Sequence, residues 1–164
     1  MRLLLGPFRW LFTAVVVFVL FFLAQLVPYR VDDPPVVAEP RWDTPATRAL
    51  AVTACFDCHS NESRPATWEK VAPLSWWITN HVRAGRAAVN FSEWGTPDQG
   101  DADAGEIVTA VRGGAMPPGS YTWLGLHAGA KLTPAERTQL ADGLAATLAA
   151  DPGTPGTGGA PGDD

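Results

Sequence analysis

The chain has 164 residues, of which 46% are hydrophobic and 18% charged, and its formal net charge at pH 7 is −5. Residues 31–164 carry nine Lys and Arg against seventeen Asp and Glu, so this portion is distinctly acidic. Such a charge balance argues against nucleic acid as a partner and offers no basic patch to an anionic lipid surface. It suits a partner with a positive docking surface.

Residues 1–30 predict an N-terminal membrane helix. From Trp10 to Val27 the sequence WLFTAVVVFVLFFLAQLV contains no charge, and about twenty apolar residues cross a bilayer as a helix. Arg2 and Arg9 precede this stretch, so the positive-inside rule predicts a cytoplasmic N-terminus and a periplasmic remainder. We interpret the segment as an uncleaved signal anchor. A cleaved signal peptide is the alternative, although its cleavage site would match poorly.

Sequence breakers divide the rest of the chain into three parts. Residues 31–43 are rich in Pro and predict an extended, semi-rigid linker. Residues 151–164 are rich in Gly, Pro and Asp and predict a flexible tail. Residues 44–150 remain as one small domain with a modest core, to which a large cofactor would contribute substantially.

Apolar spacing and capping signals predict four helices in this domain, at residues 44–55, 74–88, 101–112 and 133–150. Thr44 and Thr133 each stand as an N-cap directly before a proline. In the last helix, Gly143 lies among small residues that allow another helix to approach closely. No convincing run of strands is present, so the fold class predicted is all-α with long ordered loops.

The motif TACFDCHSN, residues 53–61, contains both cysteines of the chain. Cys55 and Cys58 are two residues apart, with His59 directly behind the second, which is the attachment signature of c-type haem. Two thiols at this spacing add to the two vinyl groups of one haem, and the adjacent imidazole is then held under the iron. The prediction is one covalent haem c with His59 as proximal ligand.

Three other interpretations of the motif compete with haem. A zinc site needs four ligands, and only His81 and His127 remain, each alone and far away in the sequence. A redox dithiol is expected beside a β-α-β pattern, whereas this chain is predicted to be helical around the motif. The last alternative is a structural disulfide in an exported protein.

A c-type haem also needs a ligand on its distal side or an open position there. Met116, in RGGAMPPGSY, is the chain's second methionine and lies in a Gly- and Pro-rich loop where packing explains it poorly. We predict Met116 as the distal ligand, with His81 as the alternative, and interpret His127 as a structural hydrogen-bonding residue. Three arginines are candidates to pair with the haem propionates: Arg64, Arg83 and Arg86.

Several blocks together resemble a known family. They are CxxCHS, the APLSWW–HV–GR segment, NFSEW, and MPPxxY–H–A–LT–E, spread over about residues 44–149. The chain resembles the bacterial haem-binding domain family with a single C-x-x-C-H, which is similar to class I cytochrome c. That resemblance implies haem attached to Cys55 and Cys58, ligated by His59, with Met116 matching the family's MP motif. The segment ATWEK departs from the family pattern near Trp68.

The resulting hypothesis is a membrane-anchored mono-haem cytochrome c that carries electrons on the outer face of the cytoplasmic membrane. Its expected partners are redox proteins and, through the N-terminal helix, the membrane, with no nucleic acid. It is expected to be an electron carrier and no enzyme, with peroxidase-like activity as a lesser possibility. The alternative function is a haem-based sensor or binder of small ligands, with a weak or open distal site.

Overall fold

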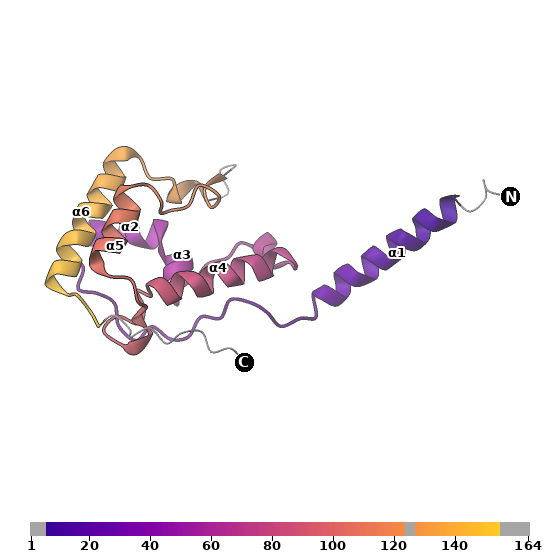
Figure 1. The fold of residues 1–164 in the computed structure, drawn as a ribbon, viewed down its shortest axis with the longest axis horizontal. Coiled ribbons are helices and arrows are strands. Elements are labelled where there is room, and N and C mark those ends of the chain that lie inside the picture. The colour runs from indigo at the N-terminus through magenta and orange to yellow at the C-terminus, as the bar shows by residue number, and fades with distance from the viewer. Residues whose placement is uncertain (1–5, 124–126, 155–164) are drawn as a thin grey trace. The chain divides into compact units, whose positions relative to one another are not determined.

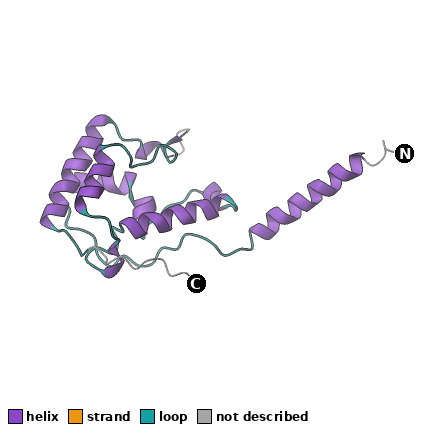
Figure 2. Ribbon diagram, in the orientation of Figure 1, coloured by secondary structure: helices purple, strands orange, loops and turns teal. Residues whose placement is uncertain are grey.

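The computed structural model describes residues 6–123 and 127–154, and this part of the chain is all-helical without a strand (Figure 2). The predicted all-α class is confirmed. The chain divides into two compact units, which are described separately. The first unit runs to Val31 and includes Pro65–Asn80, and the second holds Asp32–Arg64 and the described residues from His81 onward.

The first unit contains helix α1, Gly6–Ala24, the 3₁₀ turn η1, Thr67–Lys70, and the first half of helix α4, Leu74–Ala88. Just beyond α1, the Gln25 side chain donates to the Ala72 carbonyl at 3.1 Å and accepts from the Ala72 N–H at 2.9 Å. No helix in the described part of the chain is long and apolar enough to cross a membrane. The structure therefore does not support the transmembrane helix expected within residues 1–30.

The second unit holds the remaining helices, and their starts follow the predicted capping signals. Thr44 caps α2 by accepting the Thr47 N–H at 3.2 Å, and Thr133 forms a capping box with Glu136 at the start of α6. Asp103 caps α5 in the same way, so this helix starts after the residue 101 expected from the sequence. The elements are α2 Pro45–Ala54, α3 Phe56–His59, the second half of α4, η2 Pro97–Gln99, α5 Ala104–Arg112, η4 Ala128–Ala130 and α6 Pro134–Ala150.

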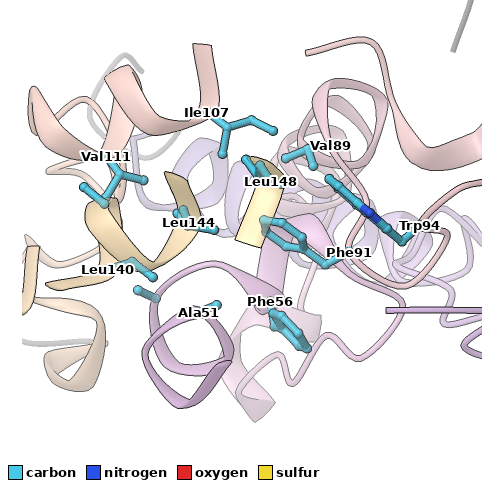
Figure 3. Packing of buried hydrophobic residues seen from close by; sticks show 12 residues of the cluster. Ala51, Phe56, Val89, Phe91, Trp94, Ile107, Val111, Leu140, Leu144 and Leu148 are labelled. Atoms are coloured by element: carbon cyan, nitrogen blue, oxygen red, sulfur yellow. The ribbon is translucent and has the colours of Figure 1, made fainter. Parts of the chain in front are cut away.

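The core of this unit forms where α6 packs against α2 and α5, three helices that lie side by side in Figure 1. A Cβ added to Gly143 on α6 would overlap the side chain of Thr47 on α2. The expectation that the small residues of α6 admit a neighbouring helix is therefore confirmed. The apolar stripe of α6 fills the centre of the cluster in Figure 3, with Leu140, Leu144 and Leu148.

Residues 32–43, the N-terminal strap, lie outside any helix, and hydrogen bonds hold them against the rest of the second unit. The N–H groups of Val37 and Ala38 donate to the Ser92 carbonyl at 2.9 and 3.1 Å, and the Trp94 N–H donates to Ala38 at 3.0 Å. Further along, the Arg41 N–H donates to the Asp151 carboxylate at 2.9 Å. The strap is therefore part of the folded unit, because neighbouring loops pair its backbone groups.

Candidate haem-attachment site

The two cysteines and the histidine of the motif lie on one helical turn. Helix α2 ends just before Cys55, which closes that helix and opens α3. The Cys55 carbonyl accepts from the N–H groups of Cys58 and His59 at 3.1 and 2.9 Å. The turn thus gathers two thiols and an imidazole in the order that attachment through two thioethers requires.

Both cysteines are partly buried. Burial raises the pKa of the Cys55 thiol to about 12, and the neighbouring Cys58 adds to this shift. Cys55 is therefore a neutral thiol near pH 7. Within the described residues, no group of three or more His, Cys, Asp and Glu side chains is placed to hold a metal ion. The set of two thiols and one imidazole fits a c-type haem, which is attached through two thioethers and ligated by the histidine.

The two residues between the cysteines orient α3. Phe56 is buried in the core, where its ring stacks on Phe91 with ring centroids 6.0 Å apart (Figure 3). Asp57 is partly buried, and its Oδ1 accepts the Arg64 N–H at 3.0 Å while its Oδ2 accepts the Tyr121 hydroxyl at 2.5 Å. Phe56 therefore fixes the motif to the core, and Asp57 connects it to a loop more than sixty residues away.

The His59 ring is held by main-chain carbonyls of α4 and the loop behind it. Its Nδ1 lies 2.8 Å from the Gly85 carbonyl and 3.1 Å from the Val89 carbonyl. A carbonyl oxygen only accepts, so Nδ1 carries the proton and Nε2 of the neutral ring has the free lone pair. Burial lowers the pKa of His59, which favours that neutral form. This is the arrangement of a metal-ligating histidine whose other nitrogen is held in place.

Gly85 allows α4 to approach the motif closely. A Cβ at this position would lie 2.5 Å from the Cys58 carbonyl oxygen and 3.1 Å from its carbon, both backbone atoms. No larger residue fits without displacing either α4 or α3. The glycine therefore explains how its own carbonyl comes within hydrogen-bonding distance of His59.

A set of buried and partly buried polar side chains, the proximal polar network, fixes the chain that follows His59. The His59 carbonyl accepts the Phe91 N–H at 2.8 Å, and the Asn61 N–H donates to Ser92 Oγ at 2.9 Å. The Asn90 amide donates to Asn61 Oδ1 at 2.9 Å, and its own Oδ1 accepts the Ser92 N–H at 3.0 Å. The members are Ser60, Asn61, Asn90, Ser92 and Glu93.

Sequence reasoning did not assign a role to this network. Its members stand in CHSN and NFSEW, the blocks that carry the family resemblance. The sequence carries one signal for the network. Its polar residues stand in a segment that also supplies the buried Phe91 and Trp94. Their pairing partners lie about thirty residues away in the chain, which local patterns do not reveal.

Arg86, named above as a candidate partner of a haem propionate, joins the strap to the motif in the structure. Its guanidinium donates to the Ser60 carbonyl at 2.8 Å and to the Asp32 carbonyl at 2.6 Å. It also donates to Asp33 Oδ1 at 2.7 Å and to Ser63 Oγ at 3.1 Å. With these acceptors around it, Arg86 stabilises the proximal side of the site.

Met116 lies in the loop of residues 113–122, which follows α5 and is called the distal loop after the role predicted for Met116. Its N–H donates to the Ala110 carbonyl at 3.0 Å, and its carbonyl accepts from Arg137 of α6 at 2.9 Å. Its side chain is 38% exposed. The main chain of Met116 is thus anchored to α5 and α6, and its role as distal ligand stays a prediction.

The two other histidines occupy different surroundings. His81 is exposed on α4, and its role as alternative distal ligand likewise stays a prediction. His127 is partly buried and packs on Tyr121, with ring centroids 3.9 Å apart. The expected hydrogen-bonding role of His127 stays a prediction.

The helical domain thus presents two thiols and an imidazole held by carbonyls on one turn, a pattern found in haem-binding proteins. A family model described as a haem-binding domain matches residues 19–146 of the chain. The chain belongs to that haem-binding domain family. Neither curated proteins nor solved structures gave a match.

Proposed function

We propose that the protein is a mono-haem c-type cytochrome that carries electrons and is no enzyme. Cys55 and Cys58 would hold one haem through thioethers, with His59 as proximal and Met116 as distal ligand. Bound haem supplies an iron that cycles between Fe(II) and Fe(III), and Met/His ligation raises its potential. The proposed fold type is that of class I cytochrome c, in which the contact of α2 with α6 would join the first and last helices of the domain.

The observation that carries the proposal is the position of the His59 ring. Two backbone carbonyls fix its Nδ1 at 2.8 and 3.1 Å, and the thiols of Cys55 and Cys58 precede it on the same turn. A histidine held in this way has one tautomer and one ring orientation, so its Nε2 is prepared to ligate iron. The two thiols that precede it on the same turn support covalent attachment.

The proposed location is the periplasmic face of the cytoplasmic membrane, with an uncleaved N-terminal anchor and redox proteins as partners. The support is the uncharged sequence of residues 10–27, which Arg2 and Arg9 precede. Large apolar side chains along α1 from Phe8 to Leu23 are also exposed. Fractionation of cells that produce the full chain tests this location. Recovery of the haem-loaded chain in the soluble periplasmic fraction would overturn it.

The test of haem attachment is a visible spectrum of the full chain, produced in a host with export and haem-lyase machinery. Acid-acetone extraction after denaturation should leave the haem on the chain, because thioethers survive it. Cys58→Ala should make attachment incomplete. If wild-type haem is extracted completely, the c-type proposal is wrong.

The test of the distal ligand is the methionine-to-Fe(III) charge-transfer band of the oxidised protein. Met116→Ala should abolish this band, while His81→Ala should leave it unchanged. The reduced wild-type protein should not bind carbon monoxide readily, because Met116 occupies the sixth position. A missing band together with rapid carbon monoxide binding would favour the sensor alternative. Loss of the native ligand signature in His81→Ala would assign the site to His81.

A further inference from the structure

We propose that Tyr121 is a positioning residue that fastens the distal loop to α3 and so keeps Met116 available to the iron. The inference rests on the proposed function, in which Met116 is the distal ligand. It adds a connection between the two sides of the site, through a residue that lies five positions after the predicted ligand.

The connection is a hydrogen bond from the Tyr121 hydroxyl to Asp57 Oδ2, at 2.5 Å. Asp57 stands between the two cysteines on α3, and its Oδ1 accepts the Arg64 N–H at 3.0 Å. The carboxylate is thus held in one orientation and presents its second oxygen to the loop. Hydrogen bonds to an ionised carboxylate are shorter and stronger than those between neutral groups.

The Tyr121 ring is supported on its other side. His127 packs against it with ring centroids 3.9 Å apart, and the Tyr121 N–H donates to the Pro118 carbonyl at 3.0 Å. Tyr121 is partly buried, so the end of the distal loop is anchored through a side chain with limited freedom.

The remaining anchors of the loop lead to other helices. The Met116 N–H bonds to Ala110 of α5, and the Met116 carbonyl accepts from Arg137 of α6. The bond of Tyr121 to Asp57 adds a direct link to α3, the helix that carries His59. It therefore ties the segment of the distal ligand to that of the proximal ligand.

Such a link matters because the Met116 side chain is 38% exposed on a loop rich in Gly and Pro. An axial ligand on a loop leaves the iron whenever the loop opens, and an external ligand can then take its place. Removing the tyrosine hydroxyl weakens the closed loop without touching Met116, the thiols or His59. The expected result is a distal site that exchanges its ligand more easily.

The experiment compares Tyr121→Phe with wild type as full-length, haem-loaded protein. We expect the haem to stay attached, the methionine charge-transfer band to weaken, and cyanide affinity of the ferric form to rise about tenfold, as loss of a hydrogen bond to a charged group implies. Tyr29→Phe is the matched control. Tyr29 is the chain's other tyrosine, and its hydroxyl also donates at 2.5 Å, to Asn80 Oδ1 in the first unit. This control should leave cyanide affinity unchanged.

Met116→Ala separates the failure of this inference from the failure of the proposed function. If Met116→Ala raises cyanide affinity but Tyr121→Phe does not, Tyr121 has no positioning role and the inference is overturned. If Met116→Ala has no effect, or no haem is retained, the proposed ligation fails and with it the role toward Met116.

Amide hydrogen exchange of residues 113–122 tests the tether itself, with or without haem. In Tyr121→Phe these amide hydrogens should exchange about tenfold faster than in Tyr29→Phe, because the loop has lost one hydrogen bond. Equal exchange in the two variants would overturn the tether.

Discussion

The proximal side and the distal loop of this site are built in different ways. On the proximal side, two carbonyls hold the His59 ring, and the next two residues, Ser60 and Asn61, are buried and hydrogen-bonded. In the distal loop, every residue from Gly113 to Met116 is exposed, and main-chain bonds to α5 and one bond from the Arg137 side chain hold this segment. One side is specified by many buried contacts and the other by a small number of tethers.

This difference indicates which part of the site is rigid and which part can exchange a ligand. A buried network with satisfied polar groups has one arrangement, because any alternative leaves a donor or acceptor without a partner. An exposed loop opens at low free-energy cost. The comparison predicts that changes on the proximal side act on stability, whereas changes in the distal loop act on ligand exchange at the iron.

The largest expected effect is that of Gly85→Ala on the proximal side. The new Cβ would meet the Cys58 carbonyl oxygen at 2.5 Å, and neither backbone can move aside freely. Overpacking of this kind should lower the free energy of unfolding by about 3 kcal/mol. Urea denaturation of the full chain measures it, and the variant should also load less haem because the acceptor of His59 is displaced.

Gly119→Ala is the matched control in the distal loop. A Cβ there meets nothing within 4 Å, so its stability should change by less than about 0.5 kcal/mol. Equal losses of unfolding free energy in the two glycine variants would contradict the proposed difference in rigidity between the two regions.

A smaller proximal effect is expected for Asn90→Ala. Asn90 is 4% exposed, donates to Asn61 Oδ1 and accepts the Ser92 N–H. The substitution removes these hydrogen bonds and leaves Asn61 and Ser92 buried, which should lower the free energy of unfolding by about 2 kcal/mol. In the distal loop, Thr122→Ala removes only an exposed contact to the Gly119 carbonyl at 3.5 Å. Thermal or urea unfolding should rank the two variants in that order, and the reverse order would contradict the rigid proximal network.

Arg137→Gln tests the distal tether at Met116 itself. The guanidinium donates to the carbonyls of Val111 and Met116, both at 2.9 Å. Its loss should cost about 1 kcal/mol of stability and weaken the methionine charge-transfer band. Arg112→Gln is the control, because the ion pair of Arg112 with Asp142 is exposed and worth little. A band that weakens equally in both variants would mean that Arg137 does not act through Met116.

Local sequence signals predicted the parts of the fold that depend on neighbouring residues. The caps at Thr44 and Thr133 start their helices, and Gly143 meets α2 as its small size suggested. The spacing of Cys55 and Cys58 before His59 predicted a haem-binding protein, and family membership confirms that class. Each of these signals is complete within a few residues.

Hydrogen bonds between residues far apart in the chain could not be predicted from the sequence. The acceptors of the His59 ring lie 26 and 30 residues away, and they are main-chain carbonyls, which no side-chain pattern marks. The contacts of Arg86 with Asp32 and Asp33, more than fifty residues away, are likewise not marked by any local pattern.

The smallest expected effect tests how far the order of the second unit extends along the strap. Glu39 accepts from Arg48 at 2.7 and 2.6 Å and from Trp42 at 2.8 Å. The hydrogen bond from Arg48 lowers the pKa of Glu39 below its ordinary value of 4.5. The folded state thus favours the ionised carboxylate. Its contribution is complete above the unfolded pKa and is lost as the pH falls through the lower folded value.

Wild type should therefore exceed Glu39→Gln in stability by about 0.5 kcal/mol near neutral pH, since Arg48 is partly solvated. The difference should shrink as the pH falls below 4.5, the ordinary pKa of the group. Urea denaturation of both proteins across this range measures the difference directly. A difference that stays constant with pH would show that the carboxylate charge of Glu39 does not stabilise the strap. A difference that grows on acidification would mean that folding raises the pKa of Glu39 instead of lowering it.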